Sequence, residues 1–324
     1  MDECKTFPQG LPQFDVRLAP PDLSRWRAGN TGIAGITSFD GPLPGPHVVL
    51  MSLVHGNELA GAIVLAELLD AGLRPLRGRL SFGFANLAAF DRFDATQPTA
   101  SRYVDEDLNR LWDPPLLAGN RRSVELDRAR ELRPVVDSAD VLIDLHSMLW
   151  TSEPLILCGP LSKGRRLAIA MGQPGLLVAD SGHVSGRRII DYGRFANNRA
   201  PQAAVLVEAG QHWHPDTVDM TRRSVAGALR HLHMTGPHPA LPPPQSAPAP
   251  RVAEVTTVVT AATASFQFVQ PFKGGDVIAA RNTLLAIDGE TEVRTPHDNC
   301  LLVMPSLRPS RGHTAVRLAR MLEA

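Results

Sequence analysis

The chain has 324 residues, with 33 Lys and Arg against 33 Asp and Glu, so its formal charge at pH 7 is zero. This length exceeds that of a usual single domain, and one large and one small domain are therefore expected. With no basic excess and an aromatic content of only 5%, the composition excludes the electrostatic footprint of a nucleic-acid-binding protein.

The first ten residues, M-D-E-C-K-T-F-P-Q-G, are not typical of a secretory signal, because acidic residues stand where cations are needed and no apolar core follows. The apolar runs along the chain are all too short for a membrane span. The three cysteines, Cys4, Cys158 and Cys300, are far apart, which argues against a disulfide framework and against a thiolate zinc site. These features predict a cytoplasmic protein that is not embedded in a membrane.

The N-terminal segment, residues 1–40, contains Pro20-Pro21 and Gly-rich turns and is expected to form an extended lead-in to the edge of a sheet. Beyond it, short apolar runs typical of buried strands alternate with amphipathic stretches typical of helices. The alternation predicts an α/β fold whose central sheet is mixed, largely parallel and flanked by helices. The predicted strands cover residues 48–54, 80–85, 141–145, 154–157 and 203–207, and the predicted helices cover 58–70, 123–137, 161–171 and 215–234.

A proline-rich segment marks a boundary after this unit. Residues 235–250, T-G-P-H-P-A-L-P-P-P-Q-S-A-P-A-P, are expected to form an extended, semi-rigid linker between a large domain at 1–234 and a small one at 251–324. The small domain is predicted to be all-β, since its β-branched runs alternate and Gly-Gly-Asp and Asp-Gly segments mark turns. It either walls a substrate cleft or builds a homo-oligomer, and the sequence leaves both roles open.

The segment V-H-G-N-E-L-A-G around His55 carries the strongest chemical signal. It lies where the strand at 48–54 gives way to the helix at 58–70, so His55 and Glu58 meet at a strand-to-helix junction, and Gly56 allows the backbone to turn. Neutral imidazole and carboxylate are suitable Zn²⁺ ligands. Taken alone, H-x-x-E at a helix start is more often a solvated His followed by a Glu that complements the helix dipole.

Two further residues complete a candidate catalytic site. His146 ends the strand at 141–145, and Glu208 ends the strand at 203–207. Because parallel strands deliver their carboxyl ends to one edge of a sheet, both side chains should approach the junction described above. Two imidazoles, a carboxylate and a water make a catalytic zinc site, with one zinc ion per chain. Glu208 beside it would accept a proton from the attacking water.

Three polar residues between these segments indicate a small anionic substrate. Arg102, Asn109 and Arg110 fall within nine positions in S-R-Y-V-D-E-D-L-N-R-L-W. Arg binds a carboxylate with a planar fork, Asn can hold one of its oxygens, and a guanidinium beside zinc would stabilise an oxyanion. D-L-N-R alone is more often a turn, in which Arg110 pairs with Asp107 or Asp113.

Four other residues carry weaker signals. Asp144 either orients a metal-bound His or caps backbone amides, and both roles stay open. His212 and His214 follow Glu208 in a loop that is predicted to lie at the rim of the site or to face solvent. His183, in a Gly- and Ser-rich segment, has no assigned role.

Four motifs in one order resemble those of the succinylglutamate desuccinylase/aspartoacylase family, a branch of the zinc carboxypeptidase-like hydrolases. The resemblance covers roughly residues 45–235, and four matches in order are far more specific than any one. The motifs are H-G-N-E at 55–58, D-L-N-R at 107–110, D-L-H at 144–146 and V-E-A-G at 207–210.

The resemblance implies a zinc carboxypeptidase-like fold and a role for each residue of the site. The chain departs from the family pattern where Asn86 is followed by Leu87 instead of Pro, and neither Arg194 nor Arg199 aligns with the Arg that precedes the catalytic Glu. An N-acetylaspartate specificity is therefore not carried over. The implied roles are zinc ligand for His55, Glu58 and His146, general base for Glu208, oxyanion stabiliser for Arg102, and substrate-carboxylate binding for Asn109 and Arg110.

Together these features predict a zinc-dependent amidohydrolase that cleaves the amide bond of an N-acyl amino acid or a similar small carboxylate-bearing amide. Two alternatives stay open. One is a zinc carboxypeptidase or deacylase that acts on a peptide or polymer terminus, and the other is a non-catalytic, metal-dependent carboxylate-binding protein. Glu208 and Arg102 argue against the binding protein, which needs neither a base nor an oxyanion-stabilising group.

Overall fold

The computed structural model describes residues 14–183, 185–246 and 248–322. Within them, eleven strands form one mixed sheet in the order β1-β3-β2-β4-β7-β5-β6-β8-β14-β13-β10. These strands are β1 (Ile36–Asp40), β2 (Leu43–Ser52), β3 (Arg77–Phe84), β4 (Val141–Met148), β5 (Leu155–Leu157), β6 (Leu176–Ala179), β7 (Ala203–Gln211), β8 (Arg251–Thr260), β10 (Val277–Ile278), β13 (Cys300–Val303) and β14 (Thr314–Met321).

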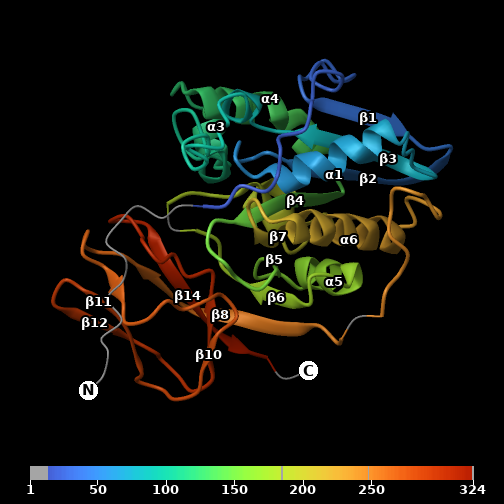
Figure 1. Cartoon of the computed structure of the whole chain (residues 1–324). Coiled ribbons are helices and arrows are strands. Elements are labelled where there is room, and N and C mark those ends of the chain that lie inside the picture. The colour runs from blue at the N-terminus through green and yellow to red at the C-terminus, as the bar shows by residue number, and fades with distance from the viewer. Residues whose placement is uncertain (1–13, 184, 247, 323–324) are drawn as a thin grey trace.

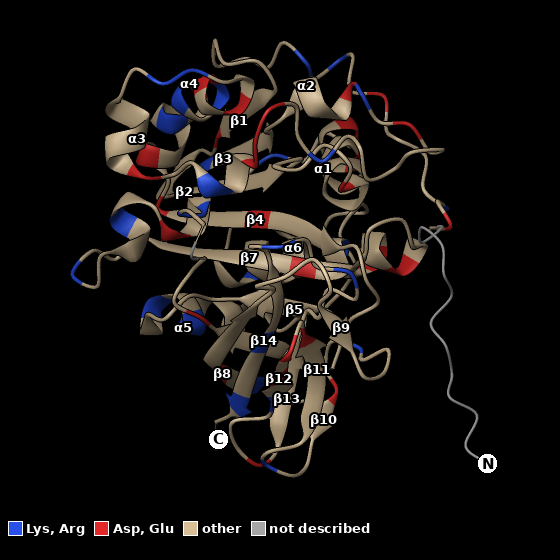
Figure 2. Ribbon diagram, turned by 90° about the vertical axis from the view of Figure 1, so that its left-hand side faces the viewer, with Lys and Arg blue, Asp and Glu red and all other residues tan. Residues whose placement is uncertain are grey.

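The middle of this sheet is parallel. β2 pairs in parallel with β3 and β4, and β4 pairs in parallel with β7, so their carboxyl ends lie along one edge. Parallel strands that are buried on both faces need nearly continuous apolar sequence, and β2, β4 and β7 supply it. Figure 2 shows how rarely acidic residues interrupt these strands: β4 carries only Asp144, and β7 carries only Glu208.

Helices cover both faces of the sheet (Figure 1). On one face, α1, α5 and α6 share a core with strand residues such as Leu50 and Val205. On the other face, α3, α4 and three short 3-10 segments share a core with alternate strand residues such as Val49 and Leu206. The helices are α1 (Leu59–Asp70), α2 (Leu87–Phe90), α3 (Pro114–Ala118), α4 (Val124–Ser138), α5 (Ser162–Met171) and α6 (Pro215–His231), and the 3-10 segments are η1 (Leu108–Arg110), η2 (Ile189–Asp191) and η3 (Gly193–Ala196).

Local signals set the limits of these helices. α4 begins after Ser123, whose side chain accepts a hydrogen bond from the backbone N–H of Leu126, and Glu125 and Asp127 in its first turn complement the helix dipole. α5 ends at Gly172, which adopts the left-handed conformation that favours glycine. The helical layers are thus specified locally, while the sheet pairs segments that are far apart in the sequence.

The C-terminal segment extends the central sheet. β8 pairs in parallel with β6, and β14, β13 and β10 follow in antiparallel pairs. A second sheet, β12-β11-β9, shares a core with these strands. The segment at 235–250 contains no helix or strand in its described residues. The strands of the second sheet are β9 (Gln267–Phe268), β11 (Leu284–Asp288) and β12 (Thr291–Arg294).

The predicted fold class is confirmed: a mixed, largely parallel sheet flanked by helices, followed by antiparallel strands. Two strands were missed, β1 at the end of the predicted lead-in and the short β6. The first 13 residues of that lead-in, with Cys4, lie outside the described residues, whereas Cys158 and Cys300 are buried free thiols. None of the helices in the described ranges is long and apolar enough to cross a membrane.

Candidate metal and substrate site

The carboxyl ends of β2, β4 and β7 bring the predicted site residues together. His55 and Glu58 lie in the turn between β2 and α1, and both are buried. The turn packs closely against the rest of the chain, because a Cβ atom at Gly56 would lie 2.4 Å from the carbonyl carbon of Ala89. A glycine is therefore required at this point of H-G-N-E. His146, also buried, arrives from β4.

The three predicted metal ligands converge. His55 Nδ1 lies 2.7 Å from Glu58 Oε1, and His146 Nδ1 lies 2.9 Å from Glu58 Oε2. One ligand atom from each residue lies within 4.8 Å of the others, as a shared metal ion requires. Burial raises the pKa of Glu58, but His55 and His146 outweigh it and hold that pKa well below its usual value. The carboxylate is thus ready to bind a cation.

A second carboxylate backs each imidazole. His55 Nε2 lies 2.9 Å from Asp107 Oδ1, and His146 Nε2 lies 2.8 Å from Asp144 Oδ2. An N–H donated to a carboxylate on the Nε2 side leaves the Nδ1 lone pair for a metal, which is the usual arrangement around metal-bound His. The donor set and its burial fit a zinc ion. Of the two roles left open for Asp144, the structure favours orientation of His146.

Glu208 lies next to this group. It stands opposite His146 in the register of β4 and β7, and only 6% of it is exposed. Its Oε2 is buried and has no hydrogen-bond partner among the described residues. Burial, and then the charge of Glu58, raises the pKa of Glu208 to about 8, although His146 and Arg102 oppose the shift. A nearby divalent cation would favour its carboxylate form.

Arg102 contacts the metal ligands directly. Its Nη1 lies 3.3 Å from Glu58 Oε1, and its Nη2 donates to Asp107 Oδ2 at 3.1 Å. Nη2 also lies 2.9 Å from His55 Nε2. The guanidinium is therefore held beside the position where a metal and a reacting carbonyl would meet.

Asn109 is buried, and its side-chain amide contacts polar groups on both sides. Its Nδ2 lies 3.3 Å from both Asp144 Oδ2 and His146 Nε2, and its Oδ1 accepts a hydrogen bond from the backbone N–H of Ile189. Arg110, the next residue, donates from Nη1 to the backbone oxygen of Asn109 at 2.7 Å. Both residues line the same cavity as the ligands, and their contacts with substrate stay predictions.

This cavity, called the site cavity below, has a volume of about 470 Å³. Residues 304–306 and 312–314 and Arg317 form one of its walls, so the C-terminal strands contribute to the site. His212 also lines it and is buried, which contradicts a solvent-facing position. Its Nδ1 lies 2.8 Å from the Ser147 hydroxyl, and burial lowers the pKa of His212 to about 4.

The motifs led to most of this site, but they missed two residues. For Asp107 the sequence predicts only an ion pair with Arg110, although its place at the head of D-L-N-R is a usable signal for the site. Arg317 had no signal, because it lies in a strand far from every motif and reaches the cavity only through the pairing of β14 with β8.

An α/β protein that collects two histidines and a glutamate at the carboxyl edge of its sheet, with a further carboxylate beside them, has the layout of a metal-dependent hydrolase. A sequence profile described as the succinylglutamate desuccinylase/aspartoacylase catalytic domain matches residues 44–232. This match covers more than half of the chain. The chain therefore belongs to the succinylglutamate desuccinylase/aspartoacylase family, as the four motifs predicted.

Two curated relatives match over shorter stretches. A succinylglutamate desuccinylase from Pseudoalteromonas atlantica is 34% identical over 109 residues, which is 32% of this chain and 29% of that protein. An N-acyl-aromatic-L-amino acid amidohydrolase (carboxylate-forming) from Xenopus laevis is 32% identical over 135 residues, which is 39% of this chain and 41% of that protein. The chain thus aligns with less than half the length of these relatives.

Solved structures extend the likeness to most of the chain. Succinylglutamate desuccinylase from Vibrio cholerae superposes with a TM-score of 0.67 at 16% identity, covering 89% of this chain and 86% of that one. A succinylglutamate desuccinylase/aspartoacylase from Rhodobacter sphaeroides has a TM-score of 0.64 at 19% identity, covering 89% of each chain. At such identities the likeness establishes the shared fold.

Proposed function

We propose that this chain is a zinc-dependent hydrolase that cleaves the amide bond of an N-acyl amino acid or a similar small, carboxylate-bearing amide. The observation that carries the proposal is the convergence of His55 Nδ1 and His146 Nδ1 on the Glu58 carboxylate, with the unpartnered Oε2 of Glu208 beside them. The names of the two relatives, a desuccinylase and an amidohydrolase, agree with this reaction.

His55, Glu58 and His146 would hold the zinc ion. When bound, zinc would polarise the scissile carbonyl and make the attacking water more acidic. Asp107 and Asp144 keep the two imidazoles in the orientation that exposes Nδ1. Asn109 supports this arrangement, because it contacts both Asp144 and His146.

The proton transfers belong to Glu208. Its carboxylate accepts a proton from the attacking water, and the carboxylic acid so formed then donates that proton to the leaving amine. Burial raises the pKa of Glu208 and a bound cation would lower it again, and this balance would let the group both accept and release a proton. Arg102, fixed beside Glu58, places a positive charge where the carbonyl oxygen becomes negative.

The walls of the site cavity favour a small substrate over a polymer end. The loop at 304–314 closes one side of a space of about 470 Å³, which is in the range of small-molecule sites. Arg110 at the same cavity supplies a cation for a substrate carboxylate. These features support a small anionic amide as the substrate.

Release of free amine from a panel of N-acyl amino acids, measured with Zn²⁺ present, tests the proposal. Hydrolysis of at least one member is expected, with loss of activity on chelation and recovery when Zn²⁺ is restored. Blocked peptides serve as the comparison and should react far more slowly. A panel that stays intact while carboxylates bind would show a binding protein and not an amidohydrolase.

A further inference from the structure

Arg317 is a buried cation that the proposed reaction does not use. It lies on β14, its side chain is 9% exposed, and it lines the site cavity. Its Nε is buried and makes no hydrogen bond within the described residues. A buried N–H without a hydrogen-bond partner is costly, so the position of this side chain favours a partner that the described residues do not supply.

The nearest carboxylate, Asp180, is already occupied. Its Oδ2 lies 3.8 Å from Arg317 Nε, too far for a hydrogen bond. Both oxygens of Asp180 accept hydrogen bonds of 2.8 Å from Arg188. Arg188 also donates to both oxygens of Asp191, at 2.7 and 3.1 Å. Arg188 is therefore saturated by two carboxylates, and Arg317 is left without a close one.

Arg110, at the same cavity, is in a similar position. Its Nη1 donates a hydrogen bond to the backbone oxygen of Asn109, and the Oδ2 of Asp107 lies 3.9 Å from its Nη2. Asp107 is already engaged by His55 and Arg102. Within the described part of the chain, Arg110 thus keeps guanidinium donors that an anion could use.

The guanidinium groups also act on one another. Burial lowers the pKa of Arg110 to about 10, and the positive charges of Arg102, Arg188 and Arg317 add to that shift. His183, close to the same charges, has its pKa lowered to about 3, first by burial and then by Arg110 and Arg317. It stays neutral at physiological pH and adds no charge to that of the neighbouring guanidinium groups.

We infer that Arg317 binds an anionic group of the substrate, in addition to the carboxylate expected at Arg110. The C-terminal strands would then select substrates with two anionic groups. The planar fork of Arg suits a carboxylate in this second position. That the bound anion is part of a substrate rests on the proposed function. The anion site itself does not, because it needs neither zinc nor hydrolysis.

The test compares two probes of similar length, glutarate with two carboxylates and butyrate with one. NMR titration of the full-length, metal-free protein measures both dissociation constants without any catalysis. We expect glutarate to bind at least tenfold more tightly than butyrate, a difference of about 1.4 kcal/mol.

Three variants locate the effect. Arg317→Met preserves length and apolar bulk, and it should fold because Asp180 remains paired with Arg188. It should weaken glutarate binding at least tenfold and butyrate binding much less. Arg317→Lys keeps the charge but loses the planar fork, so its affinity for glutarate should lie between those of the wild type and Arg317→Met. Arg320→Met, at an exposed position of the same strand, is the matched control and should bind both probes like the wild type.

Equal weakening of both probes by Arg317→Met, or no weakening of glutarate, would overturn the inference. If that variant does not fold, the guanidinium NMR signal of Arg317 in the wild type decides, since it should shift with glutarate and not with butyrate. A glutarate preference that depends on Arg317, in a protein that hydrolyses no N-acyl amino acid, would support the anion site and refute the proposed reaction.

Discussion

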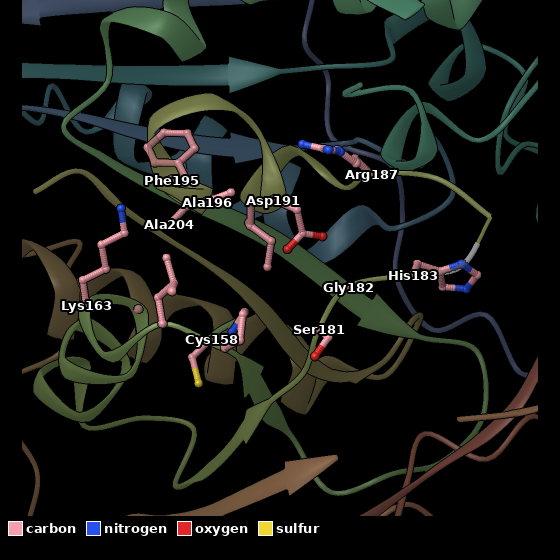
Figure 3. A pocket seen from close by; sticks show the side chains of 15 residues that line it. Cys158, Lys163, Ser181, Gly182, His183, Arg187, Asp191, Phe195, Ala196 and Ala204 are labelled. Carbon is pink, nitrogen blue, oxygen red and sulfur yellow. The ribbon is translucent and has the colours of Figure 1, made fainter. Parts of the chain in front are cut away.

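Two cavities lie along β7, and they differ in whether the charged side chains that line them have partners within the protein. The site cavity is lined by Leu206 and Glu208 of β7. A second cavity of about 300 Å³ is lined by Ala204 of the same strand, and His183 lines both. Figure 3 shows this second cavity, with Lys163 and His183 on opposite sides of it.

In the second cavity the charged side chains are paired. Lys163 Nζ donates to three backbone carbonyls of the segment 194–200 at 2.7 to 3.0 Å. Asp191 accepts from Arg188, and Arg187 lies 3.0 Å from Asp113. These groups hold the chain together and leave little for a ligand.

In the site cavity, by contrast, Glu208 Oε2 and Arg317 Nε have no hydrogen-bond partner among the described residues. Ligand atoms of His55, Glu58 and His146, one from each residue, also lie within 4.8 Å of one another there, which is close enough to share a cation. The unpartnered Glu208 and Arg317 atoms cost stability, and a ligand in the site cavity would offset that cost. The contrast separates charge that supports the fold from charge that is available for function.

The largest effect is expected from Glu58→Gln. The variant loses the only carboxylate among the three metal ligands, whose two oxygens face the two imidazoles. Zinc content, measured by elemental analysis after dialysis, should fall to background, and amide hydrolysis should fall with it. A variant that keeps one zinc per chain would contradict the assigned ligand set.

Glu208→Gln should separate chemistry from metal binding. The amide cannot accept the water proton, so kcat should fall about 10²- to 10⁴-fold while zinc content stays at the wild-type level. A normal kcat would show that another group is the base, and a loss of zinc would show that Glu208 is a ligand.

The raised pKa of Glu208 predicts a pH effect in the metal-free protein. Burial raises this pKa from 4.5 to about 8, so the folded state binds a proton more tightly than the unfolded state. The stabilisation is complete below pH 4.5 and is lost as the pH rises to about 8. The difference in thermal midpoint between wild type and Glu208→Gln should therefore change over this range, and a constant difference would contradict the shift.

Asp144→Asn should weaken zinc binding without abolishing it. Asp144 lies behind His146 and not between the ligands, so its loss disturbs the orientation and basicity of the imidazole. Zinc affinity should fall about 10- to 100-fold in a competition assay with a chelator. Unchanged affinity would make Asp144 a purely structural residue.

The smallest catalytic effect is expected at the second cavity. Lys163→Met leaves three backbone carbonyls without their shared donor, and the free energy of unfolding should drop by about 1–3 kcal/mol in a urea titration. The value of kcat/KM should stay at the wild-type level. A large loss of activity in a folded variant would mean that the second cavity also serves the reaction.

Much of the fold followed from local pattern. Apolar runs predict β2, β3, β4, β5 and β7, and amphipathic spacing predicts α4, α5 and α6, because burial imposes these periods on the sequence itself. α1 lies where an amphipathic helix is predicted, but nine of its twelve residues are buried. β6 was not predicted, since a strand of four residues has too few positions to show a periodic pattern. β1 was hidden by the turns that precede it.

The sequence by itself determined which residues could form the metal group. His55, Glu58 and His146 each stand just after or at the end of an apolar strand, and a parallel sheet brings such positions to one edge. The same rule predicts the position of Glu208, which lies toward the carboxyl end of the neighbouring strand β7. The chemistry of these side chains and their place on strand ends are properties of short segments.

Only the tertiary structure decided how these charges are shared. That Asp107 backs His55, that Arg188 saturates Asp180, and that Arg317 is left over all depend on distances between segments far apart in the chain. The energy of a charge pair depends on the distance between its two groups, and local periodicity does not contain the distance between segments that are far apart in the chain. For this reason motifs could place the ligands, whereas the Arg317 side chain, whose Nε lacks a hydrogen-bond partner among the described residues, emerged only from the folded chain.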